Sequence, residues 1–219
     1  SMYTHAGPEI AVASTKAYTS QVVLLAILAI YCAEILEVAD KKITQKLKQE
    51  LIDLPNKIEE TLKLENLSKD IAKQIYLSND MFFLGRGIDY PVAMEGSLKL
   101  KEISYIHSEA YPGGELKHGP ISLIDTDFPV IGIITDETLA SKTISNIQEV
   151  ISRGAKTIVV TNQELSKTFD YVFQIPSVNK YLSPILSVIP LQLLSYYIAK
   201  EKGLDVDKPR NLAKSVTVE

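Results

Sequence analysis

The sequence predicts an α/β protein, folded as a three-layer α/β/α sandwich around about five parallel strands. After residue 80, short apolar runs alternate with helical segments, which is the element order of such a fold. The runs are continuously apolar, so we expect strands buried on both faces, as in a parallel sheet. Gly154 and Gly203 follow two of the helices as C-terminal stops. The expected helices cover residues 90–105, 138–152 and 183–202, and the expected strands cover residues 81–84, 108–111, 130–134, 157–160 and 171–175, the second of these being the weakest.

Three further helices are expected before the sheet. Residues 1–13 have no hydrophobic period and contain a Gly-Pro pair, so we expect a loop there. Ser14 or Thr15 can cap the first helix, which runs to about Leu36. This helix is apolar nearly all round, which predicts that other parts of a protein cover most of its sides. The other two helices are expected over residues 41–64, with Pro55 as a bend or break, and over residues 66–77.

Composition excludes several classes of function. The 219 residues, 46% of them apolar, are enough for one ordinary domain with an appendage. A net charge of -4 and scattered basic residues argue against a nucleic-acid partner. The single cysteine, Cys32, excludes a disulfide framework, favours the cytoplasm and is expected in the core. No signal peptide is recognised, and the longest apolar run, residues 22–33, is too short to span a membrane. The first two residues, Ser1-Met2, indicate a piece cut from a longer chain.

The predicted helix over residues 90–105 carries three charged residues on one face. Glu95, Lys99 and Glu102 are spaced by four and three residues, which aligns them along the helix. Their neighbours are mostly apolar, so this helix is expected to be largely buried. Buried charges need partners or a pocket. From spacing alone, two interpretations stay open: a structural salt-bridged face, or an acid/base pair in a pocket.

The turn Gly85-Arg86-Gly87 lies between the first strand and that helix. Asp89 is expected to cap the helix, with Pro91 in its first turn. Ligands of parallel sheets bind beyond the carboxyl ends of the strands, and backbone N–H groups here could hold a phosphate. A tight strand-to-helix turn is the favoured alternative. The sequence does not assign roles to Arg86 or Glu95.

Three segments of the chain together resemble one family. They are AGPEIAVASTKAYTSQ (residues 6–21), FFLGRGIDYPVAMEGSLKLKEISYIHSEAYPGGELKHGP (residues 82–120) and DKPRNLAKSVTVE (residues 207–219). They are similar to the isomerase half of the glutamine–fructose-6-phosphate aminotransferases, or glucosamine-6-phosphate synthases, and the resemblance extends along essentially the whole chain. In that family a glutaminase domain precedes two SIS (sugar isomerase) domains with flavodoxin-like sheets. The resemblance implies that residues 1–40 end the first SIS domain, 41–205 form the second, and 206–219 form a C-terminal catalytic tail.

The resemblance also implies a reaction and the residues that carry it. The family makes glucosamine-6-phosphate from fructose-6-phosphate and glutamine, as a precursor of UDP-GlcNAc, and its isomerase half needs no metal or other cofactor. Lys214 matches the lysine that forms a Schiff base with the sugar carbonyl, and Glu102 matches the carboxylate that moves a proton between C1 and C2. Lys99 matches a lysine that assists at the neighbouring oxygen. His118 matches a histidine of ring opening that reaches in from the partner subunit. The positions that line the sugar are matched by Val12, Ser14 and Ala213.

These residue types suit that chemistry. A Schiff base needs a neutral amine, which desolvation or nearby positive charge favours. Moving a proton from C1 to C2 needs one group that acts first as base and then as acid on the same face of the sugar. Lys99 and Glu102 are close enough along the helix to reach one bound sugar. An imidazole can donate and accept protons near neutral pH, as ring opening requires.

Two parts of the family are missing from this sequence. Cys32 does not match the N-terminal cysteine of the glutaminase domain, and no Ser/Thr-rich segment resembles the phosphate-holding loop SQSGET of the first SIS domain. We therefore expect the chain alone to be weak or inactive as an isomerase and unable to use glutamine. The expected partners are a sugar phosphate, a second copy in a homodimer, and the glutaminase and first SIS domains of a longer chain. Neither nucleic acid nor a membrane is expected, and the expected location is the cytoplasm.

Two other functions stay open. One is a non-catalytic SIS module that binds a sugar phosphate, and the other is a related phosphosugar isomerase or deglycase. Regulatory SIS proteins usually add a DNA-binding helical domain and a basic face, and neither is evident here. The tail that contains Lys214 favours the aminotransferase, because it matches the C-terminus of that family.

Overall fold

The structure describes residues 1–214, and it confirms the predicted five-stranded parallel sheet. In the computed structural model the strands lie side by side in the order β2-β1-β3-β4-β5, and every neighbouring pair is parallel. This is the flavodoxin-like order. The strand bounds are β1 Asp80–Gly85, β2 His107–Pro112, β3 Pro129–Ile134, β4 Lys156–Thr161 and β5 Tyr171–Gln174. The five last residues of the predicted tail, 215–219, lie outside the described residues.

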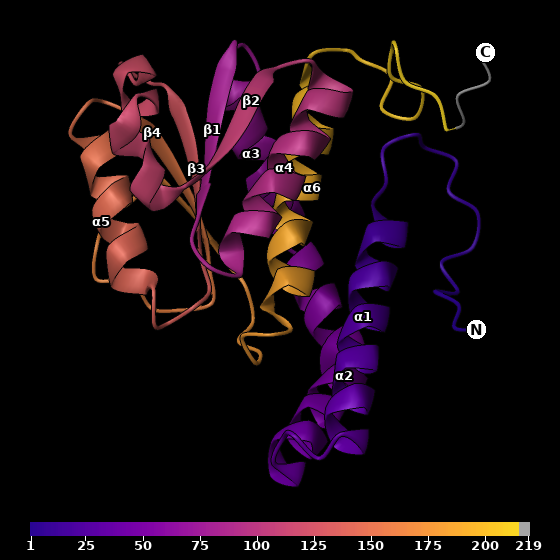
Figure 1. The fold of residues 1–219 in the computed structure, drawn as a ribbon. Helices are drawn as coiled ribbons and strands as arrows, with labels where there is room; N and C mark the ends of the chain where they lie inside the picture. The colour runs from indigo at the N-terminus through magenta and orange to yellow at the C-terminus, as the bar shows by residue number, and fades with distance from the viewer. Residues whose placement is uncertain (215–219) are drawn as a thin grey trace.

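Helices cover both faces of the sheet (Figure 1). On one face lie α3 (Glu65–Ile75), α4 (Asp89–Ser104) and α6 (Ser183–Glu201). The other face is covered by α5 (Ala140–Ile151) and the 3₁₀ turns η1 (Gly113–His118) and η2 (Pro120–Leu123). Neighbouring residues of one strand enter the two cores in turn: Phe83 joins the α4–α6 side and Phe82 the α5 side. Burial on both faces explains why the strands read as continuous apolar runs.

The two N-terminal helices project from the sandwich as an antiparallel pair (Figure 1). They are α1 (Lys16–Ile35) and α2 (Lys41–Leu62). Asp40 caps α2 by accepting a 2.7 Å hydrogen bond from the Lys42 N–H. Pro55 lies inside α2 without breaking it.

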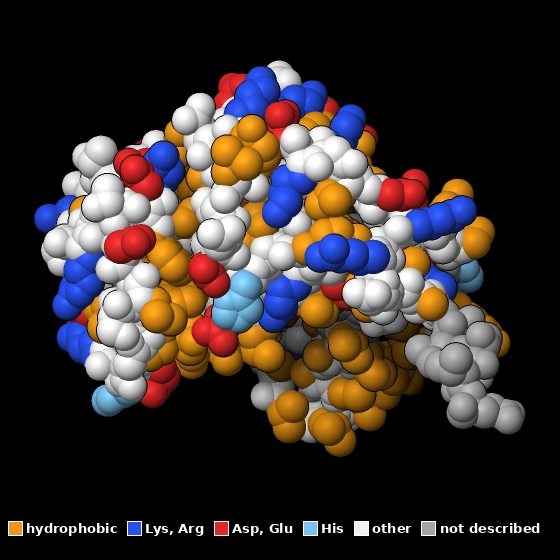
Figure 2. Space-filling view, turned by 90° about the horizontal axis from the view of Figure 1, so that it is seen from above, with side chains coloured by type: hydrophobic (Ala, Val, Ile, Leu, Met, Phe, Trp, Pro, Cys, Tyr) orange, Lys and Arg blue, Asp and Glu red, His pale blue; other side chains and the backbone are white. Residues whose placement is uncertain are grey.

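The prediction that α1 is covered on most sides is wrong for the described residues. Ile30 is the only buried residue of the helix, whereas Leu25 and Tyr31 are 62% and 59% exposed. Cys32, expected in the core, is also exposed. The reason is that α1 packs on α2 and α6 with one side only. Figure 2 shows hydrophobic side chains gathered at the lower edge of the molecule in that view.

By length and composition, α1 is the one helix within residues 1–214 that could cross a membrane. The helix has 20 residues and is therefore longer than the apolar run of residues 22–33, which by itself is too short to span a membrane. A helix that packs on another protein domain passes the same test, so this feature alone is weak evidence.

The Gly85-Arg86-Gly87 turn is a tight connection between β1 and α4. A Cβ atom at Gly85 would lie 2.5 Å from the backbone carbon of Asp89, so no side chain fits there. Arg86 points across to α5, where its Nε and Nη2 donate to the Asn146 side-chain oxygen at 3.1 and 2.9 Å. Arg86 therefore ties the turn to α5, and the turn favours the structural interpretation.

Asp89 does not cap α4, contrary to the sequence expectation. Ile88 occupies the cap position, and Asp89 is the first helical residue. Its buried carboxylate accepts hydrogen bonds from the backbone N–H and the hydroxyl of Thr135, at the end of β3. Burial raises the pKa of Asp89 although these bonds act in the other direction. The side chain therefore joins α4 to the sheet.

Replacing Gly85 with alanine is expected to destabilise the fold by about 2 to 3 kcal/mol, because the new methyl group would overlap the backbone of α4. Urea titration measures the free energy of unfolding. Gly114→Ala is the matched control: its Cβ would meet only the flexible end of Arg86 at 2.8 Å, so a loss below about 1 kcal/mol is expected. Equal stability of Gly85→Ala and the wild type would contradict the packing described here.

Candidate active site

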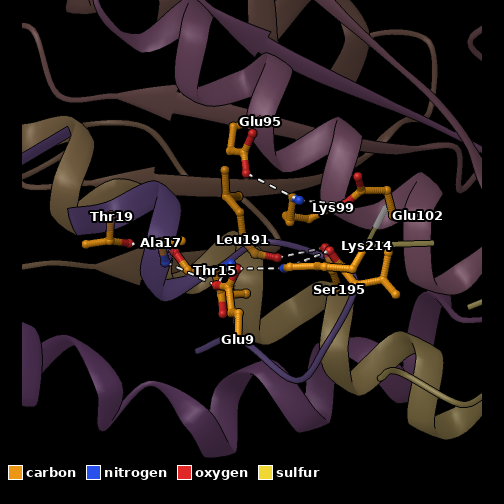
Figure 3. Close-up of polar contacts among 11 residues, drawn as sticks. Glu9, Thr15, Ala17, Thr19, Glu95, Lys99, Glu102, Leu191, Ser195 and Lys214 are labelled. Atoms are coloured by element: carbon orange, nitrogen blue, oxygen red, sulfur yellow. Dashed lines mark hydrogen bonds and ion pairs between the residues drawn. The ribbon is translucent and has the colours of Figure 1, made fainter. Parts of the chain in front are cut away.

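The three charged residues of α4 form one cluster around a buried lysine. The Lys99 side chain is only 4% exposed, and its Nζ lies 2.5 Å from Glu102 Oε2 and 3.6 Å from Glu95 Oε1. Figure 3 shows Lys99 between the two carboxylates. The predicted alignment along one helix face is thus confirmed. The cluster has one positive and two possible negative charges, so its net charge depends on the protonation of the carboxyl groups.

Glu95 is the more deeply buried carboxyl group of this cluster, with a side chain that is 13% exposed. Burial raises the pKa of Glu95; the Lys99 charge opposes this rise, and the Glu102 charge adds to it. The phenol of Tyr18, in α1, is half-buried beside Glu95, and burial together with the Glu95 charge raises the pKa of Tyr18. Glu95 thus faces α1 and an apolar environment, whereas the Glu102 side chain is 22% exposed.

A second group of contacts joins the two ends of the described chain. Lys214 Nζ lies 2.9 Å from Glu9 Oε2 (Figure 3). It also donates to the backbone oxygens of Ala11, at 3.0 Å, and Val12, at 3.4 Å. The Val12 N–H also donates to the Asp207 carbonyl at 3.0 Å. Hydrogen bonds therefore join the loop before α1 to the tail after α6.

The role of Glu9 could not be predicted from the sequence pattern. Its Oε1 accepts hydrogen bonds from the N–H groups of Thr15, at 2.9 Å, and Ala17, at 3.1 Å, and so it caps α1 from a distance. Thr15 occupies the cap position, but its side chain makes no capping bond, which corrects the expectation for Ser14 or Thr15. Burial would raise the pKa of Glu9, but the bonds from Lys214 and from the two N–H groups outweigh it and lower this pKa to about 2.

The loop and the tail both meet the last turn of α4. Ala13 is buried in a small cluster with Ile103 of α4 and Ala199 of α6. Tyr105 follows α4 in a left-handed conformation, and its hydroxyl accepts a 2.7 Å bond from the Arg210 N–H. The Arg210 guanidinium lies 4.2 Å from the centre of the Tyr105 ring. These contacts place the loop, the tail and the turn that carries Glu102 in one region.

The remaining predicted residues divide between this region and the opposite end of the sheet. Val12 and Ser14 are half-buried in the loop, and Ala213 is exposed beside Lys214. His118 ends η1 and is exposed. It follows the carboxyl end of β2, whereas Glu102 lies in the last turn of α4, just before the amino end of β2. Within one chain the two residues therefore lie at opposite ends of this strand. The predicted site thus lies at the amino ends of the strands, away from the carboxyl ends where ligands of such sheets usually bind.

A cavity of about 630 Å³ lies next to the cluster. Glu95 is the cluster residue that it touches, and its walls come from α1, α4 and β2. Its lining includes Tyr18, Met94, Leu98, Lys101 and Tyr111. Within residues 1–214, no three His, Cys, Asp or Glu side chains gather in a way that could hold a metal ion. What the described side chains can do is exchange protons and, through a lysine amine, attack a carbonyl group.

The raised pKa of Glu95 gives a prediction for stability against pH. Below pH 4.5, its ordinary value, the carboxyl is protonated in folded and unfolded chains alike, and its contribution to stability is complete. As the pH rises toward the raised folded pKa, the unfolded chain ionises first and that contribution is lost. We expect the free energy of unfolding of the wild type, relative to Glu95→Gln, to fall between pH 4.5 and 7.5 in urea titrations. A difference that does not change with pH would contradict the burial of this charge.

Known proteins are similar to this chain, some of them along its whole length. The SIS domain profile matches residues 74–201. Proteins named glutamine–fructose-6-phosphate aminotransferase [isomerizing] from Clostridium perfringens and Clostridium tetani are each 55% identical over 100% of this chain. The chain spans only 37% and 36% of the length of these two relatives.

A solved structure gives the same result at the level of the fold. It is the C-terminal domain of glucosamine-fructose-6-phosphate aminotransferase from Francisella tularensis. It superposes with a TM-score of 0.88 and 41% identity, covering 92% of this chain and 58% of that one. The sheet order, the profile and this superposition agree, and the chain belongs to the SIS domain family.

Proposed function

We propose that this chain supplies catalytic side chains for the sugar isomerisation half of a glutamine–fructose-6-phosphate aminotransferase. The observation that carries the proposal is the convergence of the Lys214 tail and the loop of residues 9–15 on the last turn of α4, beside Lys99 and Glu102. Relatives with that name match the chain along its full length, which favours this activity over a non-catalytic binding module.

In the proposed reaction, the Lys214 amine attacks C2 of the open-chain form of fructose-6-phosphate. Water leaves, and an imine links C2 to Nζ. Ammonia then displaces the Lys214 amine from C2, which frees Nζ and leaves an imine of ammonia at C2. Glu102 takes a proton from C1 and returns one to C2, and the C1 hydroxyl loses its proton as C1 becomes a carbonyl, so the ketose imine becomes an aldose with an amine at C2. Lys99, held 2.5 Å from Glu102, assists proton movement at the neighbouring oxygen and stabilises negative charge there.

Other residues complete the proposed site. The loop and tail residues Val12, Ser14 and Ala213 line the bound sugar. His118 lies at the far end of β2 from Glu102, which supports a role in ring opening at the site of a partner subunit in a homodimer. The single cysteine favours a cytoplasmic setting.

The proposed division of the chain follows the same family plan. Residues 1–40 end a first SIS domain, 41–205 form the second, and 206–219 form the catalytic tail. The profile match over residues 74–201 falls inside the second of these. In the longer protein, the glutaminase domain and the first SIS domain would supply ammonia and the phosphate-holding loop.

Borohydride trapping tests the proposal. The chain is incubated with a high concentration of fructose-6-phosphate, the imine is reduced, and peptides are mapped by mass spectrometry. The proposal predicts a sugar adduct on Lys214 above every other lysine. An adduct spread over exposed lysines in proportion to their exposure would contradict it.

A further inference from the structure

Glu9 divides its two carboxylate oxygens between two tasks. Oε1 accepts the N–H groups of Thr15, the cap residue of α1, and of Ala17, in its first turn, and Oε2 faces Lys214 Nζ at 2.9 Å. The partial positive charge of a helix N-terminus favours a carboxylate at this place. The Glu9 side chain is 9% exposed, and that of Lys214 is 49% exposed. Glu9 is therefore a fixed anion, and the lysine that comes to it from the tail is the more exposed partner.

The surroundings of the Lys214 nitrogen fit an ammonium ion. Three oxygens face it: Glu9 Oε2, the Ala11 carbonyl and the Val12 carbonyl, at 2.9, 3.0 and 3.4 Å. An ammonium group has three N–H donors and can satisfy all three oxygens, whereas a neutral amine has two. The three loop groups that face this nitrogen are thus all hydrogen-bond acceptors, and one of them is charged.

We propose that Glu9 is a positioning residue that holds the Lys214 ammonium group in place on the loop until a sugar binds. This inference rests on the proposed function, in which Lys214 attacks a carbonyl group. A protonated amine cannot make that attack, because its lone pair is occupied. The contact with Glu9 therefore protects a half-exposed lysine from unrelated carbonyl compounds. Attack requires Lys214 to lose one proton and leave at least one of its three acceptors.

The variant Glu9→Gln separates the two tasks of the side chain. Its amide oxygen still accepts the N–H groups of α1, while its NH₂ group faces Lys214 in place of the charged oxygen. The helix cap is retained and the anion is lost. Circular dichroism checks that α1 is intact.

Acetylation by acetic anhydride at pH 7.5 measures how readily the Lys214 amine reacts. Peptide mass spectrometry follows Lys214 against exposed Lys63 in the same sample. At low salt, we expect Lys214 to react about threefold faster in Glu9→Gln than in the wild type. Added salt should raise the wild-type rate toward that of the variant, because it screens the ion pair, and should leave the variant unchanged. Equal rates, or a faster variant rate with no salt effect on the wild type, would overturn the role of the Glu9 charge.

Borohydride trapping with fructose-6-phosphate on the same samples separates this inference from the proposed function. The difference in the acetylation rate of Lys214 between the wild type and Glu9→Gln decides the role of Glu9. Absence of a sugar adduct on Lys214 in both proteins would instead defeat the proposed Schiff base. The two ideas can therefore fail independently.

Discussion

Replacing Glu102 with glutamine is expected to slow deuterium exchange at C1 of fructose-6-phosphate by about 10² to 10⁴-fold, because the amide cannot accept the C1 proton. The rate is measured by NMR in D₂O at high protein concentration, after subtraction of the buffer rate, since the chain alone is expected to be slow. Trapping of the imine on Lys214 should persist, because it precedes proton transfer. The substitution would thus slow proton transfer without preventing formation of the imine.

Glu95→Gln is the matched control for this prediction. Glu95 lies on the same helix and flanks the same lysine, but it faces α1 and the neighbouring cavity. Its loss is expected to change the exchange rate by less than about threefold, a change that corresponds to less than 1 kcal/mol. A larger effect of Glu95→Gln than of Glu102→Gln would reverse the assignment of the two carboxylates.

Replacing Lys214 with arginine is expected to lower the yield of the reduced sugar adduct by at least about 100-fold. The guanidinium stays protonated and does not form an imine with a ketone, although it preserves the positive charge opposite Glu9. Preservation of the charge makes this variant a test of chemistry more than of folding. Mass spectrometry of the reduced chain measures the yield.

Lys208→Arg is the control for that variant. Lys208 is an exposed lysine of the same tail, six residues earlier, and it has no assigned role. Its replacement should leave the adduct yield unchanged. An adduct that survives in Lys214→Arg and disappears in Lys208→Arg would move the Schiff base to the other lysine.

Local sequence pattern was sufficient to predict the sandwich. Each strand is a short apolar run because helices cover both faces of the sheet, and Phe82 and Phe83 show the two faces in neighbouring residues. The same reasoning was wrong for α1. Apolar composition shows that a helix avoids water, but it does not show which surface covers it, and here Leu25 and Cys32 are exposed. The capping rule failed at Asp89 because a hydrogen bond from Thr135, just after the neighbouring strand β3, holds that carboxylate.

The candidate site was only partly predictable. The spacing of Glu95, Lys99 and Glu102 predicted one helix face, since the period of a helix fixes it. No local pattern could reveal that Glu9 meets Lys214, 205 residues later, because that contact depends on how the loop and tail close over α4. Resemblance named Lys214, and the structure added its partner.

The most direct measurement is a crystal structure of this chain after reduction of the imine formed with fructose-6-phosphate. The account predicts a single covalent bond from Lys214 Nζ to C2 of the sugar, with the Glu102 carboxylate within about 3.2 Å of C1 or C2 and Lys99 beside the neighbouring oxygen. A sugar bound to another lysine, or attached to Lys214 with Glu102 turned away from both carbons, would contradict it.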